Sequence, residues 1–204
     1  MSDSTKQSII KSASKLFASK GYEGTSIREL AEASGVNVAS INYYFGSKQG
    51  LFEEMVKDFA DNKVSSITPL LEGPKSQEEF RIRLSMFMKQ FIHLATSDRE
   101  HFRMINKNLD TFFQLSPEGF ENTFLQIHEK FHEFVAFAQK HGVLRDDLDS
   151  EMITQILFGN LIEFVRAGDI RKCFSKGSID DPEYCELYIQ TLIDSYLNGV
   201  GKNA

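Results

Sequence analysis

An all-α fold is predicted by two features of the sequence. Apolar residues recur at helical spacing in most segments of the 204-residue chain. Short runs of alternating Val, Ile and Thr between Gly-rich turns, which would indicate strands, are missing from a chain that contains 18 Phe and no Trp. A chain of this length can form one domain or a small domain joined to a larger one, with a substantial apolar core.

Charge is distributed unevenly along the chain. Residues 1–50 contain six Lys or Arg against four Asp or Glu, whereas the remainder contains 17 against 25. The net charge of -6 argues against a protein that coats nucleic acid with its whole surface. A local positive patch at the N-terminal end is nevertheless sufficient to contact phosphates.

The sequence favours a cytoplasmic location. No basic-then-apolar leader begins the sequence, and no apolar run approaches 18 residues. The only cysteines are Cys173 and Cys185, which we expect to be reduced thiols because no secretory signal is present.

The first 50 residues predict three helices. Apolar residues at helical spacing mark the first from Ser4 to Ser19, and Gly21 provides its stop. The second runs from residue 27 to residue 34, because Ser26 and Glu29 form a capping-box pattern at its start. The third covers residues 38–45.

The second and third helices are predicted to form a helix-turn-helix. Ala31, Gly35 and Ile41 place a small residue, a turn glycine and an apolar anchor at the spacing that suits two short helices crossing steeply. In such a motif the second helix enters a DNA groove. A three-helix unit without a ligand is the structural alternative, but the outward residues are small or hydrogen-bonding rather than long and acidic.

Six further helices follow, giving about nine in total. They begin near Ser47, Gln77, Asp98, Pro117, Ser150 and Pro182. The sequence therefore predicts a DNA-binding domain over residues 1–50 and a larger helical domain over residues 51–204.

Residues 6–59 resemble the DNA-binding domain of the TetR family of bacterial transcription regulators. The matching residues are Ile10, Ala13, Leu16, Phe17, Gly21, Tyr22, Thr25, Ser26, Ile27, Arg28, Leu30, Ala31, Ala33, Gly35, Val36, Tyr44, Phe45, Ser47, Lys48, Leu51 and Phe52. The resemblance implies an all-helical second domain that binds an effector and dimerises.

The resemblance places DNA contacts on ten residues: Thr25, Ser26, Arg28, Val38, Ala39, Ser40, Asn42, Tyr43, Tyr44 and Lys48. Lys48, Thr25 and Tyr44 suit phosphates. Arg28 and Asn42 suit base edges, because Arg matches guanine and Asn matches adenine through paired hydrogen bonds. Val38 departs from the Lys or other polar residue of many members, which favours contact with a thymine methyl group at this position.

A single helix-turn-helix domain makes few contacts with DNA, so the chain is predicted to act as a homodimer on an inverted repeat of double-stranded DNA. The eighth and ninth helices are the candidate dimer interface because they carry an excess of apolar faces. The candidate residues are Leu157, Leu161, Phe164, Tyr188, Leu192 and Tyr196.

Many of the Phe residues fall in the fifth to eighth helices. Each could be ordinary core, but together they suggest an aromatic-lined cavity for an apolar or flat aromatic effector. The candidate lining residues are Phe87, Phe91, Phe102, Phe124, His128 and Phe158. These features predict a repressor released from its operator by the effector, with an activator or a metal-responsive regulator of the same fold as alternatives.

A rival prediction comes from His128-Glu129-Lys130-Phe131-His132, which satisfies the H-E-x-x-H pattern of zinc metallopeptidases. Histidines four apart share a helix face and could bind zinc, with Glu129 as general base. Val135 and Ala138 stand where the longer form of the motif needs Gly and His, and Glu151 is a third ligand only by spacing. We therefore expect no enzyme activity, no metal site and no cofactor.

Overall fold

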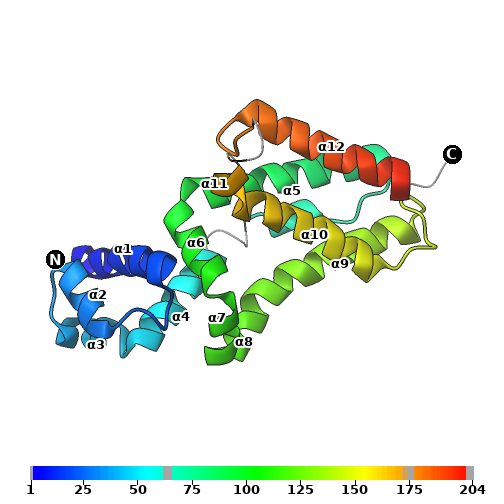
Figure 1. Cartoon of the computed structure of the whole chain (residues 1–204). Helices are drawn as coiled ribbons and strands as arrows, with labels where there is room; N and C mark the ends of the chain where they lie inside the picture. Colours follow the sequence, from blue (N-terminus) through cyan, green and yellow to red (C-terminus); the bar gives the residue numbers. More distant parts are fainter. Residues whose placement is uncertain (1, 62–65, 172, 174–176, 201–204) are drawn as a thin grey trace. The chain divides into compact units, whose positions relative to one another are not determined.

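The computed structural model describes residues 2–61, 66–171, 173 and 177–200, and every regular element in these ranges is helical (Figure 1). The elements are α1 (Ser2–Lys20), α2 (Ile27–Ser34), α3 (Val38–Phe45), α4 (Lys48–Phe59), the 3-10 turn η2 (Thr68–Leu71), α5 (Gln77–Ser97), α6 (Arg99–Lys107), α7 (Leu109–Leu115), α8 (Pro117–Phe120), the π-helical turn η3 (Glu121–Leu125), α9 (Gln126–Lys140), α10 (Ser150–Arg166), α11 (Gly168–Arg171) and α12 (Pro182–Val200). None of the helices in the described ranges has the length and hydropathy needed to cross a membrane.

The chain forms two compact units. The first contains residues 1–63 and 98–124, and the second contains residues 64–97 and 125–204. The first compact unit therefore contains α4 and the helices α6 to α8 in addition to the helix-turn-helix. The division into a DNA-binding part over 1–50 and an effector part over 51–204 concerns function and stays a prediction.

The first unit is built on aromatic packing beneath α1. In it α1 packs against α2 and α6, and α3 packs against α2 and α4 (Figure 1). The ring of Phe52 is fully buried, with its centroid 5.5 Å from that of Phe17, 5.0 Å from that of Tyr22 and 6.0 Å from that of Phe112. One aromatic cluster thus joins α1 and the connector that follows it to α4 and α7.

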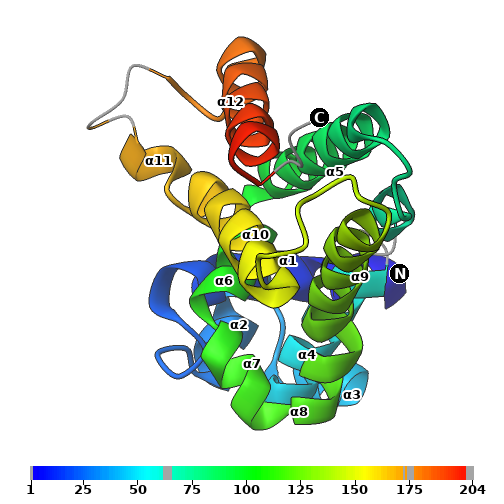
Figure 2. The ribbon, with the colours of Figure 1, turned by 90° about the vertical axis from the view of Figure 1, so that its right-hand side faces the viewer.

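The second unit pairs α5 with α12 and α9 with α10 (Figure 2). Its core contains Phe80, Phe87, Phe131 and Phe134, each no more than 1% exposed. The Phe80 and Phe134 rings stack with centroids 5.0 Å apart. Burial of a Phe side chain contributes about 1.5–3 kcal/mol, so these rings supply much of the unit's stability.

The helix-turn-helix boundaries agree with those predicted, since α2 ends at Ser34 and α3 spans Val38–Phe45. Two later helices differ. The predicted sixth helix is broken at Asn108, which ends α6 and precedes α7. The predicted seventh helix consists of α8, a π-helical turn and α9.

Candidate nucleic-acid interface

The start of α2 is held by a complete capping box. The Glu29 amide donates to Ser26 Oγ over 3.2 Å, and the Ser26 amide donates to Glu29 Oε2 over 2.8 Å. Lys20 Nζ, at the end of α1, donates to Glu29 Oε1 over 2.7 Å. Glu29 therefore ties the end of α1 to the start of the helix-turn-helix.

These contacts predict a pH-dependent stability. The hydrogen bond from Lys20, followed by the bond from the Ser26 amide, lowers the pKa of Glu29 from its usual 4.5 to about 2. A lowered pKa in the folded state stabilises the fold above the unfolded pKa, and this stabilisation is lost as pH falls from about 4.5 toward 2. We expect Glu29→Gln to lower the Tm at pH 7, and the difference from wild type to narrow progressively below pH 4.5.

Thermal unfolding followed by circular dichroism between pH 7 and pH 3 measures this difference. The matched control is Glu32→Gln, at an exposed position of the same helix. A Tm difference for Glu29→Gln that does not change with pH would contradict the assignment.

The turn between α2 and α3 uses one left-handed residue. Gly35 has φ 69° and ψ 28°, a conformation that costs other residues free energy because of their Cβ. The Gly35 and Val36 amides donate to the carbonyls of Glu32 and Ala31, which closes α2. Asn37 then caps α3 by accepting from the Ser40 amide over 2.8 Å.

The α3 helix buries one face and exposes the other. Ile41 is fully buried and Phe45 is 8% exposed, so these two residues anchor the helix. Tyr43 is 82% exposed, and Ala39 and Asn42 are exposed beside it. The exposed face of α3 therefore carries a methyl group, a carboxamide and a phenol. Groups of these kinds can contact base edges in a DNA groove.

Four of the predicted DNA-contact residues lie at the edges of this face or on α2. Val38, Ser40 and Tyr44 are partly exposed, and Arg28 is exposed on α2. The Ser40 hydroxyl donates to Asn37 Oδ1 over 3.0 Å, which leaves its oxygen free to accept from a base or a water. Ser26 is exposed while its hydroxyl caps α2.

The structure revises the role of Thr25. This residue is 1% exposed, and its hydroxyl donates to the Gly21 carbonyl over 2.8 Å. The hydroxyl predicted to contact a phosphate thus stabilises the connector between α1 and α2. Lys48 is partly exposed, and its Nζ donates to the carbonyls of Tyr22 and Thr25 over 3.0 and 3.1 Å.

Comparison with known proteins identifies this helical unit. Residues 9–55, which include all of α2 and α3, match the family model described as bacterial regulatory proteins, tetR family. Residues 9–55 thus carry a DNA-binding domain of the TetR family. The curated relatives reported below are transcriptional regulators.

Two curated relatives show which part of the chain matches best. The probable HTH-type transcriptional regulator YttP of Bacillus subtilis is 54% identical over 59 residues, which are 29% of this chain and 28% of that relative. The icaADBC negative transcriptional regulator IcaR of Staphylococcus aureus is 23% identical over 171 residues, covering 69% of this chain and 89% of IcaR. High identity is thus confined to a short stretch.

Solved structures show the same fold over nearly the whole chain. The ketosteroid transcriptional regulator KstR2 of Mycobacterium tuberculosis aligns with a TM-score of 0.73 at 16% identity, covering 97% of this chain and 95% of that one. The TetR-family regulator PfmR of Thermus thermophilus aligns with a TM-score of 0.67 at 24% identity, covering 95% and 99%.

The predicted effector residues are divided between the two compact units. Phe87, Phe91, His128 and Phe158 lie in the second unit, where the Phe158 centroid is 6.1 Å from that of Phe91 and 6.3 Å from that of His128. In the first unit Phe102 lies beside Phe59, and Phe124 lies beside Phe112 and Phe120. The structure therefore brings four of the six together, as closely packed rings.

Burial revises the predicted dimer residues on α10. Leu157, Leu161 and Phe164 are at most 2% exposed within the single chain, so they fill its own core. Tyr188, Leu192 and Tyr196 on α12 are partly exposed. The Tyr188 ring stacks on Phe164 with centroids 3.6 Å apart, and its hydroxyl donates to the Asn160 carbonyl.

The H-E-x-x-H residues lie on α9 and have ordinary contacts. His132 Nε2 is 2.9 Å from Ser150 Oγ, and the His128 ring packs on Phe158. Glu129 is exposed. In the described ranges, no three His, Cys, Asp or Glu side chains are arranged to hold a metal ion.

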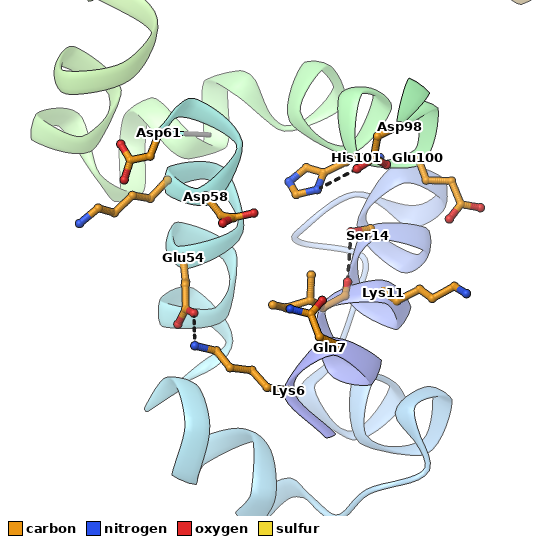
Figure 3. A pocket seen from close by; sticks show the side chains of 12 residues that line it. Lys6, Gln7, Lys11, Ser14, Glu54, Asp58, Asp61, Asp98, Glu100 and His101 are labelled. Atoms are coloured by element: carbon orange, nitrogen blue, oxygen red, sulfur yellow. Dashed lines mark hydrogen bonds and ion pairs between the residues drawn. The ribbon is translucent and has the colours of Figure 1, made fainter. Parts of the chain in front are cut away.

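A pocket of about 620 Å³ lies in the first unit between α1, α4 and the start of α6 (Figure 3). Charged side chains dominate its lining, including a Lys6–Glu54 ion pair of 2.5 Å. His101 is one of its lining residues, with Nε2 3.0 Å from the Met55 carbonyl oxygen and Nδ1 3.7 Å from Asp98 Oδ2. This polar lining differs in chemistry from the aromatic cluster of the second unit.

Proposed function

We propose that this protein is a homodimeric TetR-family repressor that binds an inverted-repeat operator in the bacterial cytoplasm and is released by an apolar or aromatic effector. The observation that carries the proposal is the exposed face of α3, presented by a capped helix-turn-helix within the segment that matches the family model. Arg28 and Asn42 would read base edges, while Lys48 and Tyr44 would contact phosphates. Val38 would lie against a thymine methyl group.

Selection of binding sites from random duplex DNA tests the DNA-binding part. The expected result is enrichment of an inverted repeat whose half-sites are about one helical turn apart or a multiple of it. Affinity should fall steeply with salt, because phosphate contacts release counterions. No enrichment at low salt would refute the proposal.

The dimer would form through the outer face of α10. Met152 and Ile156 are 48% and 55% exposed, and Gly159 and Glu163 continue the same face at helical spacing. Two apolar side chains beside a glycine allow a second helix to approach closely. Packing against a second copy would remove this apolar surface from water.

Ile156→Glu is expected to shift the dimer toward monomer, because it places a charge where two apolar faces meet. Sedimentation at micromolar concentration measures the shift, and operator affinity should fall with it. The matched control is Ile82→Glu on α5, since Ile82 is 51% exposed. Equal behaviour of the two variants would place the interface elsewhere.

The effector site is proposed within the aromatic cluster of the second unit, around Phe87, Phe91, His128 and Phe158. Its apolar chemistry agrees with the names of several structures of similar fold, which refer to ketosteroids and to fatty acid metabolism or degradation. The rings are packed against each other, so an effector would have to separate them.

Linkage connects this site to the DNA. The effector would favour a spacing of the two DNA-binding domains that does not match successive major grooves. It would then weaken DNA binding by a certain factor, and DNA must weaken effector binding by the same factor. Titration of apolar and aromatic ligands with and without operator DNA tests this equality. An activator would show ligand binding that strengthens operator binding.

A further inference from the structure

The connector between α1 and α2 passes through Tyr22, whose backbone is held on both sides. Its amide donates to Asn108 Oδ1 over 2.6 Å, and its carbonyl accepts from Lys48 Nζ over 3.0 Å. Tyr22 is 7% exposed; its hydrogen bond with Asn108 is buried, and its hydrogen bond with Lys48 is partly buried. A lost partner would leave a buried polar group unsatisfied, which costs more than the net stability of the hydrogen bond itself.

The Asn108 side chain uses its full carboxamide in this position. Besides accepting from Tyr22, its nitrogen donates to the Phe17 carbonyl over 3.2 Å and to the Met104 carbonyl over 2.6 Å. The residue is 3% exposed and stands at the break between α6 and α7. It therefore connects this break to the end of α1 and to the connector.

Lys48 holds the other side of the connector. Its Nζ donates to the carbonyls of Tyr22 and Thr25 and lies 3.8 Å from the centroid of the Tyr22 ring. An ammonium group has three donors, so one donor remains after these two bonds. Because Lys48 is partly exposed, that donor can reach a phosphate while the group stays in place.

We infer that Asn108 is a positioning residue for DNA binding: it holds Tyr22, and Tyr22 in turn holds the ammonium group of Lys48 where a phosphate of the operator passes. The inference rests on the proposed DNA-binding function. It assigns a role to a residue 60 positions away from Lys48 in the sequence. No local motif marks this residue.

A double-mutant cycle on operator affinity tests the coupling. Asn108→Ala and Lys48→Met are each expected to weaken binding about tenfold, and the double variant should bind no more weakly than Lys48→Met alone, within about twofold. Asn108→Asp keeps an acceptor for the Tyr22 amide but sets a carboxylate oxygen against the Phe17 and Met104 carbonyls, so it should recover little of the lost affinity. Asn106→Ala is the matched control, because the Asn106 side chain donates to the Phe102 carbonyl of its own helix.

Amide hydrogen exchange provides a readout that needs no DNA. Exchange at the Tyr22 amide should accelerate at least about tenfold in Asn108→Ala and remain unchanged in Asn106→Ala. Unchanged Tyr22 exchange, or losses of operator affinity that simply add, would overturn the inference. Failure of the wild-type protein to bind any duplex would overturn the proposed function instead, and the exchange readout would still decide whether Asn108 holds the connector.

Discussion

Asn42→Ala and Tyr43→Ala are each expected to reduce operator affinity by about 1–3 kcal/mol and to relax base preference at one position per half-site. Both side chains project from the exposed face of α3, and Tyr43 is the more exposed at 82%. An Asn that pairs with adenine loses two hydrogen bonds at once when it is truncated. Competition binding with single-base variants of the selected operator measures both effects.

The control for these substitutions is Asn122→Ala, at an exposed position of the same compact unit but outside the helix-turn-helix. Its operator affinity should equal that of wild type. Loss of affinity for all sequences equally, with base preference retained, would assign Asn42 and Tyr43 to phosphate contact rather than base reading.

Phe52→Ala is expected to lower the free energy of unfolding by about 3–5 kcal/mol, the largest stability effect that we predict. The ring is fully buried among Phe17, Tyr22 and Phe112, so truncation leaves a cavity that the three neighbouring rings cannot fill. Chemical denaturation monitored by circular dichroism measures the change.

Phe113→Ala removes the same side chain from the same unit at a position 52% exposed. Its free energy of unfolding should fall by less than about 1 kcal/mol, because little apolar area is exposed by the change. Similar losses in the two variants would mean that Phe52 does not organise the core of this unit.

Local rules predicted the helix-turn-helix because its determinants are close in sequence. The Ser26–Glu29 box, the left-handed Gly35 and the Asn37 cap each act within a few residues. The resulting ends of α2 and α3 agree with those predicted. The exposed face of α3 follows from helical phase, because Ile41 and Phe45 on the opposite face are buried.

Long-range contacts explain what the sequence did not reveal. Asn108 stands where the predicted sixth helix is broken, and its side chain bonds to Tyr22 and Phe17, which are 86 and 91 residues away in the sequence. The one local sign of this break is the low helix propensity of Asn. The apolar residues of α10 could serve a core or an interface, and only burial shows that Leu157, Leu161 and Phe164 belong to the core. Thr25 carries a hydroxyl suited to a phosphate, but the Gly21 carbonyl accepts its hydrogen bond.

The central claim is that two copies of this chain place their α3 helices on one face of the DNA. Titration of the selected inverted repeat, followed by sedimentation, should show two chains per duplex. Inserting about five base pairs between the half-sites rotates one of them by half a turn and should reduce affinity to that of a single half-site, whereas inserting about ten should restore part of it. Affinity that does not depend on the spacing would contradict the account.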